Sequence, residues 1–84
     1  MMTKYDLEIL ATLINNSADA SSRALSATQI MAMMDKQHQK SYSTLYRHLG
    51  SMAEKGYIQY GLIDGLASTY LISETGKMFY NAHN

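Results

Sequence analysis

Hydrogen-bonding and cationic side chains gather between residues 36 and 56 of the 84-residue chain. Ser43, Thr44 and Arg47 share one side of a predicted helix that carries no large aliphatic residue. Small hydroxyl side chains let a helix approach another molecule closely, and an arginine is long enough to donate to base edges or phosphate oxygens. This pattern favours hydrogen-bonded recognition of a polyanion. The alternative interpretation is an ordinary solvated helix face.

The charge of this segment differs from the charge of the whole chain. Seven Lys and Arg balance seven Asp and Glu overall, which argues against a polybasic protein that binds nucleic acid by bulk attraction. Between residues 36 and 56 the only acid is Glu54, and the cations are Lys36, Lys40, Arg47 and Lys55. Charge-driven contacts are therefore expected to be local.

The aromatic and imidazole side chains of this segment allow two interpretations. Tyr42 and Tyr46 flank the aliphatic stripe of the predicted helix, so they either pack at the edge of the core or place their hydroxyls on phosphates. His38 and His48 lack the spacing of a metal pair and the chain has no Cys, so we expect solvated histidines and no metal site. With His83, they would strengthen binding modestly below about pH 6.5, the ordinary pKa of imidazole.

Catalytic chemistry finds little support in the residues. The carboxylates are scattered, no glycine-rich phosphate loop follows a predicted strand, and no acid is identified that would orient His48 toward Ser41 or Ser43. We therefore predict that the protein is not an enzyme and that it uses no cofactor.

Capping motifs predict the helices that would position these side chains, over residues 4–15, 27–35 and 42–55. The motifs are a T-x-x-D box at Thr3, an S-x-x-Q box at Ser26 and a capping serine, Ser41. Residues 16–24 are polar and lack an apolar period, so they are expected to form a surface connection. Three methionines follow Ile30 in the second helix, and we favour core packing for them over a flexible binding groove; they are Met31, Met33 and Met34.

After Tyr57 the hydrophobic period changes to that of strands. Two segments rich in aromatic and β-branched residues surround Asp64 and Gly65, a dipeptide that signals a type I′ hairpin turn. Ser73 then begins a last short helix. The predicted fold is α+β: a winged helix-turn-helix with three helices, a two-stranded β-hairpin wing and a short C-terminal helix.

Two segments resemble a known superfamily. The run SYSTLYRHLGSMAEKGYI, residues 41–58, resembles the recognition helix of the PadR and MarR groups of winged-helix transcription regulators, and YLISETGK, residues 70–77, is similar to the end of their wing. The resemblance implies a small protein that binds double-stranded DNA in a sequence-specific manner and regulates transcription by occupying its site. In these groups the wing tip often carries Arg or Lys, whereas residues 62–67 here hold no cation.

The DNA-binding residues expected from the basic segment and the resemblance cover the turn and the third helix. They are Lys36, Lys40, Ser41, Tyr42, Ser43, Thr44, Arg47, His48, Ser51 and Lys55. Among them, the lysines are expected on phosphates and Arg47 on bases.

A homodimer is expected from the first helix, because it has two apolar faces. Leu7, Leu10, Ala11 and Ile14 would pack on the other helices, and a second ridge would join a partner subunit or the final helix of its own chain. The expected dimer interface is Tyr5, Ile9, Leu13, Met78 and Phe79.

The remaining expectations concern organisation and setting. Residues 1–84 are predicted to form one domain, because two cores would each be too small to fold alone. No segment has the length and apolarity of a membrane span or signal peptide, so we expect a cytoplasmic protein without a membrane partner, and no small-molecule effector is evident. The alternatives are a winged helix used as a protein-protein interaction module, or a DNA-binding component of a replication or plasmid-maintenance complex.

Overall fold

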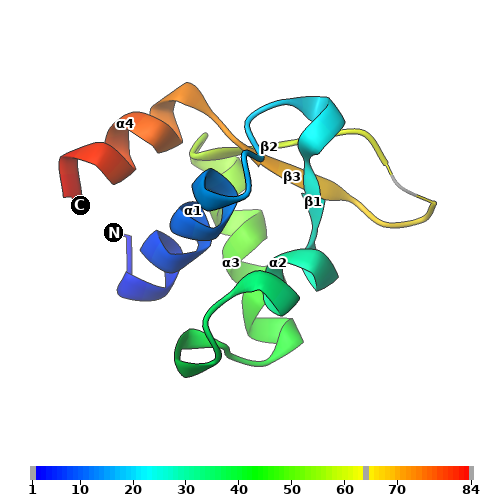
Figure 1. Ribbon diagram of the computed structural model, residues 1–84, viewed down its shortest axis with the longest axis horizontal. Helices are drawn as coiled ribbons and strands as arrows, with labels where there is room; N and C mark the ends of the chain where they lie inside the picture. Colours follow the sequence, from blue (N-terminus) through cyan, green and yellow to red (C-terminus); the bar gives the residue numbers. More distant parts are fainter. Residues whose placement is uncertain (1, 64, 84) are drawn as a thin grey trace.

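Four helices and a small three-stranded antiparallel sheet make up the fold (Figure 1). The computed structural model describes residues 2–63 and 65–83. Its helices are α1 (Lys4–Asn15), α2 (Ala27–Met33), α3 (Tyr42–Glu54) and α4 (Glu74–His83), with two 3-10 turns, η1 (Ser21–Arg23) and η2 (Lys36–His38). The strands are β1 (Leu25–Ser26), β2 (Ile58–Tyr60) and β3 (Thr69–Ile72), in the order β1-β3-β2. The arrangement is α+β, as the sequence predicts.

The predicted caps form and fix where the helices begin. The hydroxyl of Thr3 accepts from the backbone N–H of Asp6, whose carboxylate accepts from the backbone N–H of Thr3. Ser26 and Gln29 form the same reciprocal pair at the start of α2. Each satisfied N–H would otherwise lack a partner in the first helical turn. The predicted starts of α1, α2 and α3 are therefore confirmed, while α2 ends two residues and α3 one residue earlier than expected.

The sheet differs from the predicted two-stranded hairpin. Strand β1 was not predicted, since Leu25 follows the expected polar connection and Ser26 was expected to cap α2; it pairs with β3, so the sheet has a third strand. The pairing of Tyr60 with Tyr70 places Gly65 midway along the connection between β2 and β3. Gly65 does adopt a positive φ of 63°. Asp64 lies outside the described residues.

The ridge on α1 that was expected to join a partner subunit or the chain's own final helix is internal to the single chain. Tyr5, Ile9 and Leu13 belong to the buried core, with Ile9 and Leu13 completely inaccessible to solvent. The stripe expected to face the core is instead divided, because Leu10 is buried while Leu7, Ala11 and Ile14 are half-buried. Three residues of the predicted dimer interface are thus internal in the single chain. Of the other two, Met78 is exposed and Phe79 is half-buried.

The methionines of α2 divide between the core and the surface. Met34 is buried beside Ile30, and Met31 packs against the same core. Met33 is exposed. Core packing therefore accounts for two of the three.

Helix α4 is held at the end of the molecule that carries both termini, opposite the wing (Figure 1). A Cβ at Gly76 would collide with the carbonyl oxygen of Tyr57, so only glycine allows this close approach. The hydroxyl of Ser73 donates to the carbonyl of Gly56 at 2.6 Å and accepts from the backbone N–H of Gly76 at 3.0 Å. The start of α4 is therefore fixed to the residues that follow α3.

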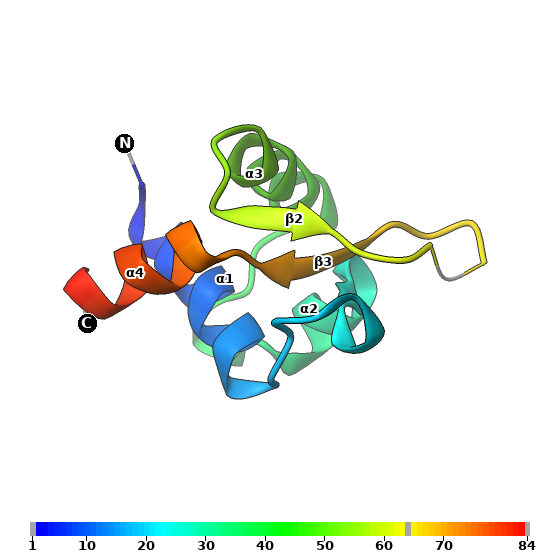
Figure 2. The same ribbon diagram turned by 90° about the horizontal axis from the view of Figure 1, so that it is seen from above.

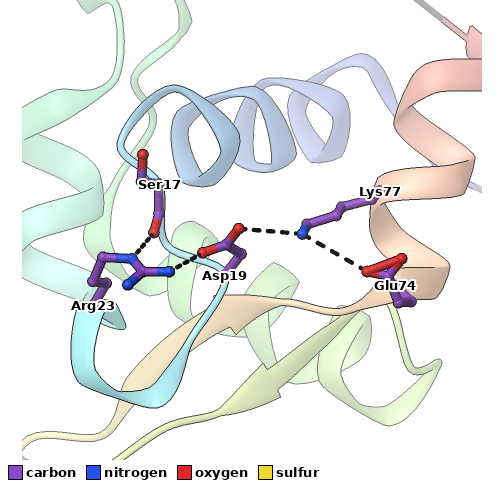
Figure 3. A network of polar contacts seen from close by, with 5 residues as sticks. All are labelled: Ser17, Asp19, Arg23, Glu74 and Lys77. Carbon is purple, nitrogen blue, oxygen red and sulfur yellow. Dashed lines mark hydrogen bonds and ion pairs between the residues drawn. The ribbon is translucent and has the colours of Figure 1, made fainter.

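A charged network joins α4 to the connection after α1 (Figure 3). Asp19 contacts Arg23 at 2.6 Å and Lys77 at 3.2 Å, and Arg23 also donates to the carbonyl of Ser17. Lys77 approaches Glu74 at 3.7 Å. The hydrogen bonds from Arg23 and then Lys77 lower the pKa of Asp19 below its ordinary value.

Candidate nucleic-acid interface

Helix α3 has a buried face and an opposite face open to solvent. Leu45, Leu49 and Met52 are buried, and the helical repeat places Ser43, Arg47 and Ser51 on the other side, where all three are exposed. Arg47 forms no ion pair within the described part of the chain. Its guanidinium is therefore available to an external acceptor.

The outward face of α3 is not uniform in charge. Glu54 is exposed on the same side as Arg47, two helical turns further on, which is about 10 Å along the axis. The negative charge of the Glu54 carboxylate repels any anion that approaches this end of the outward face. The first half of α3 is therefore the half suited to binding one.

The helix-turn-helix connection is held by side-chain caps. The side-chain amide of Gln39 donates to the carbonyls of Met31 at 2.8 Å and Met34 at 3.2 Å, which satisfies the end of α2. The hydroxyl of Ser41 accepts from the backbone N–H of Thr44 and donates to its hydroxyl at 2.9 Å. Ser41, expected at the interface, thus caps α3 and remains exposed, while Thr44, also expected there, is half-buried.

His48 turns toward α1 instead of being solvated. Its Nδ1 lies 2.6 Å from Oδ1 of Asp6, and its ring packs edge-on against Tyr5 at 5.0 Å between centroids. Only 22% of its side chain is exposed. His48, which was expected to be solvated and to contact DNA, is therefore a polar link between α3 and α1. His38 is partly exposed and lies 3.8 Å from Glu8, so it too has an acidic neighbour.

Lysines lie on the side of α3 that faces α1. Lys40 helps to line an open cavity of about 600 Å³ between the start of α1 and η2, and its ammonium lies 5.5 Å from the centre of the Tyr5 ring. Lys55 lines a neighbouring depression with Arg47 and His48. Both lysines are exposed. We call Lys40 and Lys55 the lysine flank of α3; Lys36 is exposed on η2.

Tyrosines occupy the side of α3 that faces the sheet. Tyr42 and Tyr46 pack edge to face with ring centroids 5.3 Å apart, and Tyr60 of β2 contacts Tyr70 of β3 at the same distance. Burial, followed by the nearby hydroxyls of Tyr46, Tyr60 and Tyr42, raises the pKa of Tyr70 to about 12. We call Tyr42, Tyr46 and Tyr60 the tyrosine flank. Sequence reasoning singled out the two helical tyrosines but missed Tyr60 and Tyr70, because only the strand register brings those two together.

The wing extends from the sheet away from the helices (Figure 2). Leu62, Ile63 and Leu66 are among the most exposed large apolar residues of the described chain, and Leu66 is fully accessible. No Lys, Arg or His occurs between residues 56 and 76. The sequence therefore supplies no cationic side chain to the wing, whose one acid, Asp64, lies outside the described residues.

Residues 2–63 and 65–83 contain neither a metal-binding cluster nor a membrane-spanning helix. No group of three or more His, Cys, Asp or Glu side chains there is placed to hold a metal ion. None of the helices in this part of the chain has the length and apolarity needed to cross a bilayer.

Comparisons with known proteins identify the fold. No family model matches the chain, and no curated protein matches it. Among solved structures, TubR from Bacillus megaterium pBM400 is similar over 92% of this chain and 80% of its own, with 21% identity and a TM-score of 0.76. The DNA-binding TubR fragment from Clostridium botulinum is similar over 100% of both chains, with 20% identity and a TM-score of 0.72.

A third similar structure is the Vibrio cholerae ferric uptake regulator (Fur), a protein with DNA-binding domains. The similarity covers 87% of this chain, with 20% identity and a TM-score of 0.69. This chain spans about half of the Fur chain, 53%. These similarities confirm the predicted winged helix-turn-helix fold. The narrower resemblance to the PadR and MarR groups stays a prediction.

Proposed function

We propose that this protein binds double-stranded DNA in a sequence-specific manner and acts as a small transcriptional regulator that occupies its site. The observation that carries the proposal is the outward face of α3, where Arg47 is exposed between small hydroxyl side chains and beside the lysine flank. A helix of this kind fits the major groove of B-DNA. The similar Clostridium botulinum fragment and the Fur domains bind DNA, which supports DNA binding as the role of this protein.

Each group of side chains on and beside α3 would make a different kind of contact with DNA. Arg47 donates to a base edge in the major groove, and guanine is the usual acceptor for an arginine. Ser43 and Ser51 leave room for the helix to approach. Lys36, Lys40 and Lys55 contact phosphates, which fixes the position of the helix without reading sequence. This role is non-enzymatic and places the protein in the cytoplasm with its DNA.

The protein would gain affinity as a homodimer, since two copies of α3 could contact two half-sites. The interface cannot use Tyr5, Ile9 and Leu13, which are internal. Met78 on the outer side of α4 is 70% exposed and remains available. We propose a dimer through α4 and its surroundings.

A second candidate function is a protein-protein interaction module. The observation that favours it is the wing, whose exposed apolar side chains lack any cation. A DNA-binding role in a replication or plasmid-maintenance complex would use the same α3 surface as transcriptional regulation.

A selection of bound fragments from genomic DNA, including the region upstream of the gene, tests the proposal. Binding is measured at two salt concentrations with the wild-type protein and with Arg47→Ala, and circular dichroism checks that the variant is folded. Preferential retention of particular fragments by the wild type and loss of that preference in the variant are expected. Absence of any preferred duplex would contradict the proposal and favour the protein-interaction module.

A further inference from the structure

The tyrosine flank brings together aromatic side chains from α3 and β2 over a ring of β3. Tyr42, Tyr46 and Tyr60 are 44%, 46% and 59% exposed, whereas Tyr70 beneath them is 2% exposed. The helical pair and the strand pair each have ring centroids 5.3 Å apart. The three outer rings are therefore positioned by packing but remain accessible to a ligand.

This surface lies directly beside the residues proposed to enter the groove. Tyr42 precedes Ser43 and Tyr46 precedes Arg47, and neighbouring residues of a helix are separated by about 100° around its axis. When Arg47 points into a groove, Tyr46 points toward one of its walls. The walls of a DNA groove are the phosphate backbones.

The chemistry of the tyrosine flank differs from that of the lysines. A phenol O–H is a neutral hydrogen-bond donor at physiological pH, because the ordinary pKa of tyrosine is about 10. Such a donor can bind a phosphate oxygen without neutralising the phosphate charge. A contact of this kind releases few counterions, so its contribution to affinity is expected to be nearly independent of salt.

We propose that the hydroxyls of Tyr46 and Tyr60, together with Tyr42, bind the DNA phosphate backbone on the wing side of the groove that α3 enters. The inference rests on the proposed DNA-binding function and adds a second, uncharged set of backbone contacts to it. It also assigns a role to the side of the interface that has no cationic side chain. The protein then holds one backbone through lysines and the other through tyrosines.

Tyrosine-to-phenylalanine variants test this assignment. Tyr46→Phe and Tyr60→Phe each remove one hydroxyl and keep the ring that packs against its neighbour. Dissociation constants for the selected duplex are measured from about 50 to 200 mM salt, the range over which charge-based contacts change strongly. Each variant is expected to bind about 5- to 20-fold more weakly at every salt concentration, with the slope of log affinity against log salt unchanged.

Two further variants provide the matched controls. Tyr57→Phe removes a hydroxyl between α3 and β2 and keeps the ring whose centroid lies 5.0 Å from that of Phe79, so this variant should bind DNA as the wild type does. Lys55→Gln should reduce the magnitude of the slope by about 0.9. Circular dichroism and thermal melting establish that each variant is folded.

The outcomes separate this inference from the function on which it rests. Wild-type affinity in both Tyr46→Phe and Tyr60→Phe, with Arg47→Ala impaired, would overturn the tyrosine contacts and leave DNA binding intact. A reduced salt slope in the phenylalanine variants would also overturn them, because neutral donors should not change it. Failure of the wild-type protein to bind any selected duplex would remove both proposals.

Discussion

The two flanks of α3 present different chemistry to the same groove. The side facing α1 has lysines and a polar link between His48 and Asp6. The side facing the sheet has accessible tyrosines, and residues 57–75, which form β2, β3 and the wing, include no Lys, Arg or His. Charge-based contacts weaken as salt rises, and neutral hydrogen bonds change little. One small domain can therefore divide its affinity into a salt-sensitive part and a salt-insensitive part. A zero net charge is compatible with DNA binding under this arrangement.

The flanks also differ in what supports them. The tyrosine flank rests on Tyr70, whose ring is buried between the strands and the helix. Lys40 and Lys55 are exposed and line open depressions. Changes beneath the tyrosines should therefore affect the fold, and changes among the lysines should affect binding alone.

The largest effect is expected from removal of the ring beneath the tyrosine flank. Tyr70→Ala should lower the free energy of unfolding by about 3–5 kcal/mol, because it leaves a cavity where an aromatic side chain was buried. Urea denaturation followed by circular dichroism measures the change. Lys55→Ala on the other flank should leave stability within about 0.5 kcal/mol of the wild type. Equal stability of the Tyr70 and Lys55 variants would contradict the difference in support.

Arg47 lies between the flanks and should have the next largest effect. Arg47→Ala should weaken binding to the selected site by about 1–3 kcal/mol and relax the preference at one base position. Titration against a set of duplexes with single substitutions measures both quantities. Unchanged affinity and preference would remove Arg47 from base recognition.

The lysine flank should control the response to salt. Replacement of Lys40 or Lys55 by glutamine should each reduce the slope of log affinity against log salt by about 0.9, while the preferred sequence is retained. The same replacement at Lys36 extends the test to η2. Three unchanged slopes would place the phosphate backbone elsewhere on the protein.

A cation added to the wing should give the sheet side of the interface a salt-dependent contribution to DNA affinity, as the lysine flank already has. Leu66→Arg places a guanidinium at a fully exposed position and should strengthen binding several-fold at low salt, with a gain that fades as salt rises. Leu66→Gln is the uncharged control. Equal binding by the arginine and glutamine variants would mean that the wing tip points away from DNA.

The smallest effect is expected from Asp19, which belongs to neither flank. Its pKa is lowered chiefly by the hydrogen bond from Arg23, so its ionised form stabilises the fold above the ordinary pKa of 3.8. That stabilisation is lost as the pH falls through the lowered pKa. Acid titrations of unfolding should therefore show the wild type converging on Asp19→Asn below about pH 4, with equal DNA affinity at neutral pH. A constant stability difference down to strongly acidic pH would contradict the assignment.

Local signals made much of the fold predictable from the sequence. Caps at Thr3, Ser26 and Ser41 depend on residues only three positions apart, so the starts of the helices could be placed correctly. Strand β1 could not, because two residues carry no period and their pairing with β3 joins positions more than forty residues apart. Helix α1 has two apolar stripes, and only the packed core decides which one is buried.

Part of the candidate site could also be predicted from local sequence patterns, and part depends on tertiary contacts. The outward positions of Ser43 and Arg47 follow from helical periodicity alone. The link between His48 and Asp6 spans 42 residues, and the contact between Tyr60 and Tyr70 depends on strand register. Tertiary packing determines both contacts, so sequence spacing could not predict them.

The orientation of α3 on DNA is tested most directly by cleavage from a single attached reagent. Because the chain has no Cys, Glu54→Cys supplies a unique thiol on the same side of α3 as Arg47, and Asn15→Cys supplies one at the end of α1. Each variant is labelled with an iron chelate and bound to the selected duplex. We expect DNA cuts within the site from the label on α3 and none from the label on α1. Cuts from the label on α1 and none from that on α3 would contradict the proposal that α3 enters the groove.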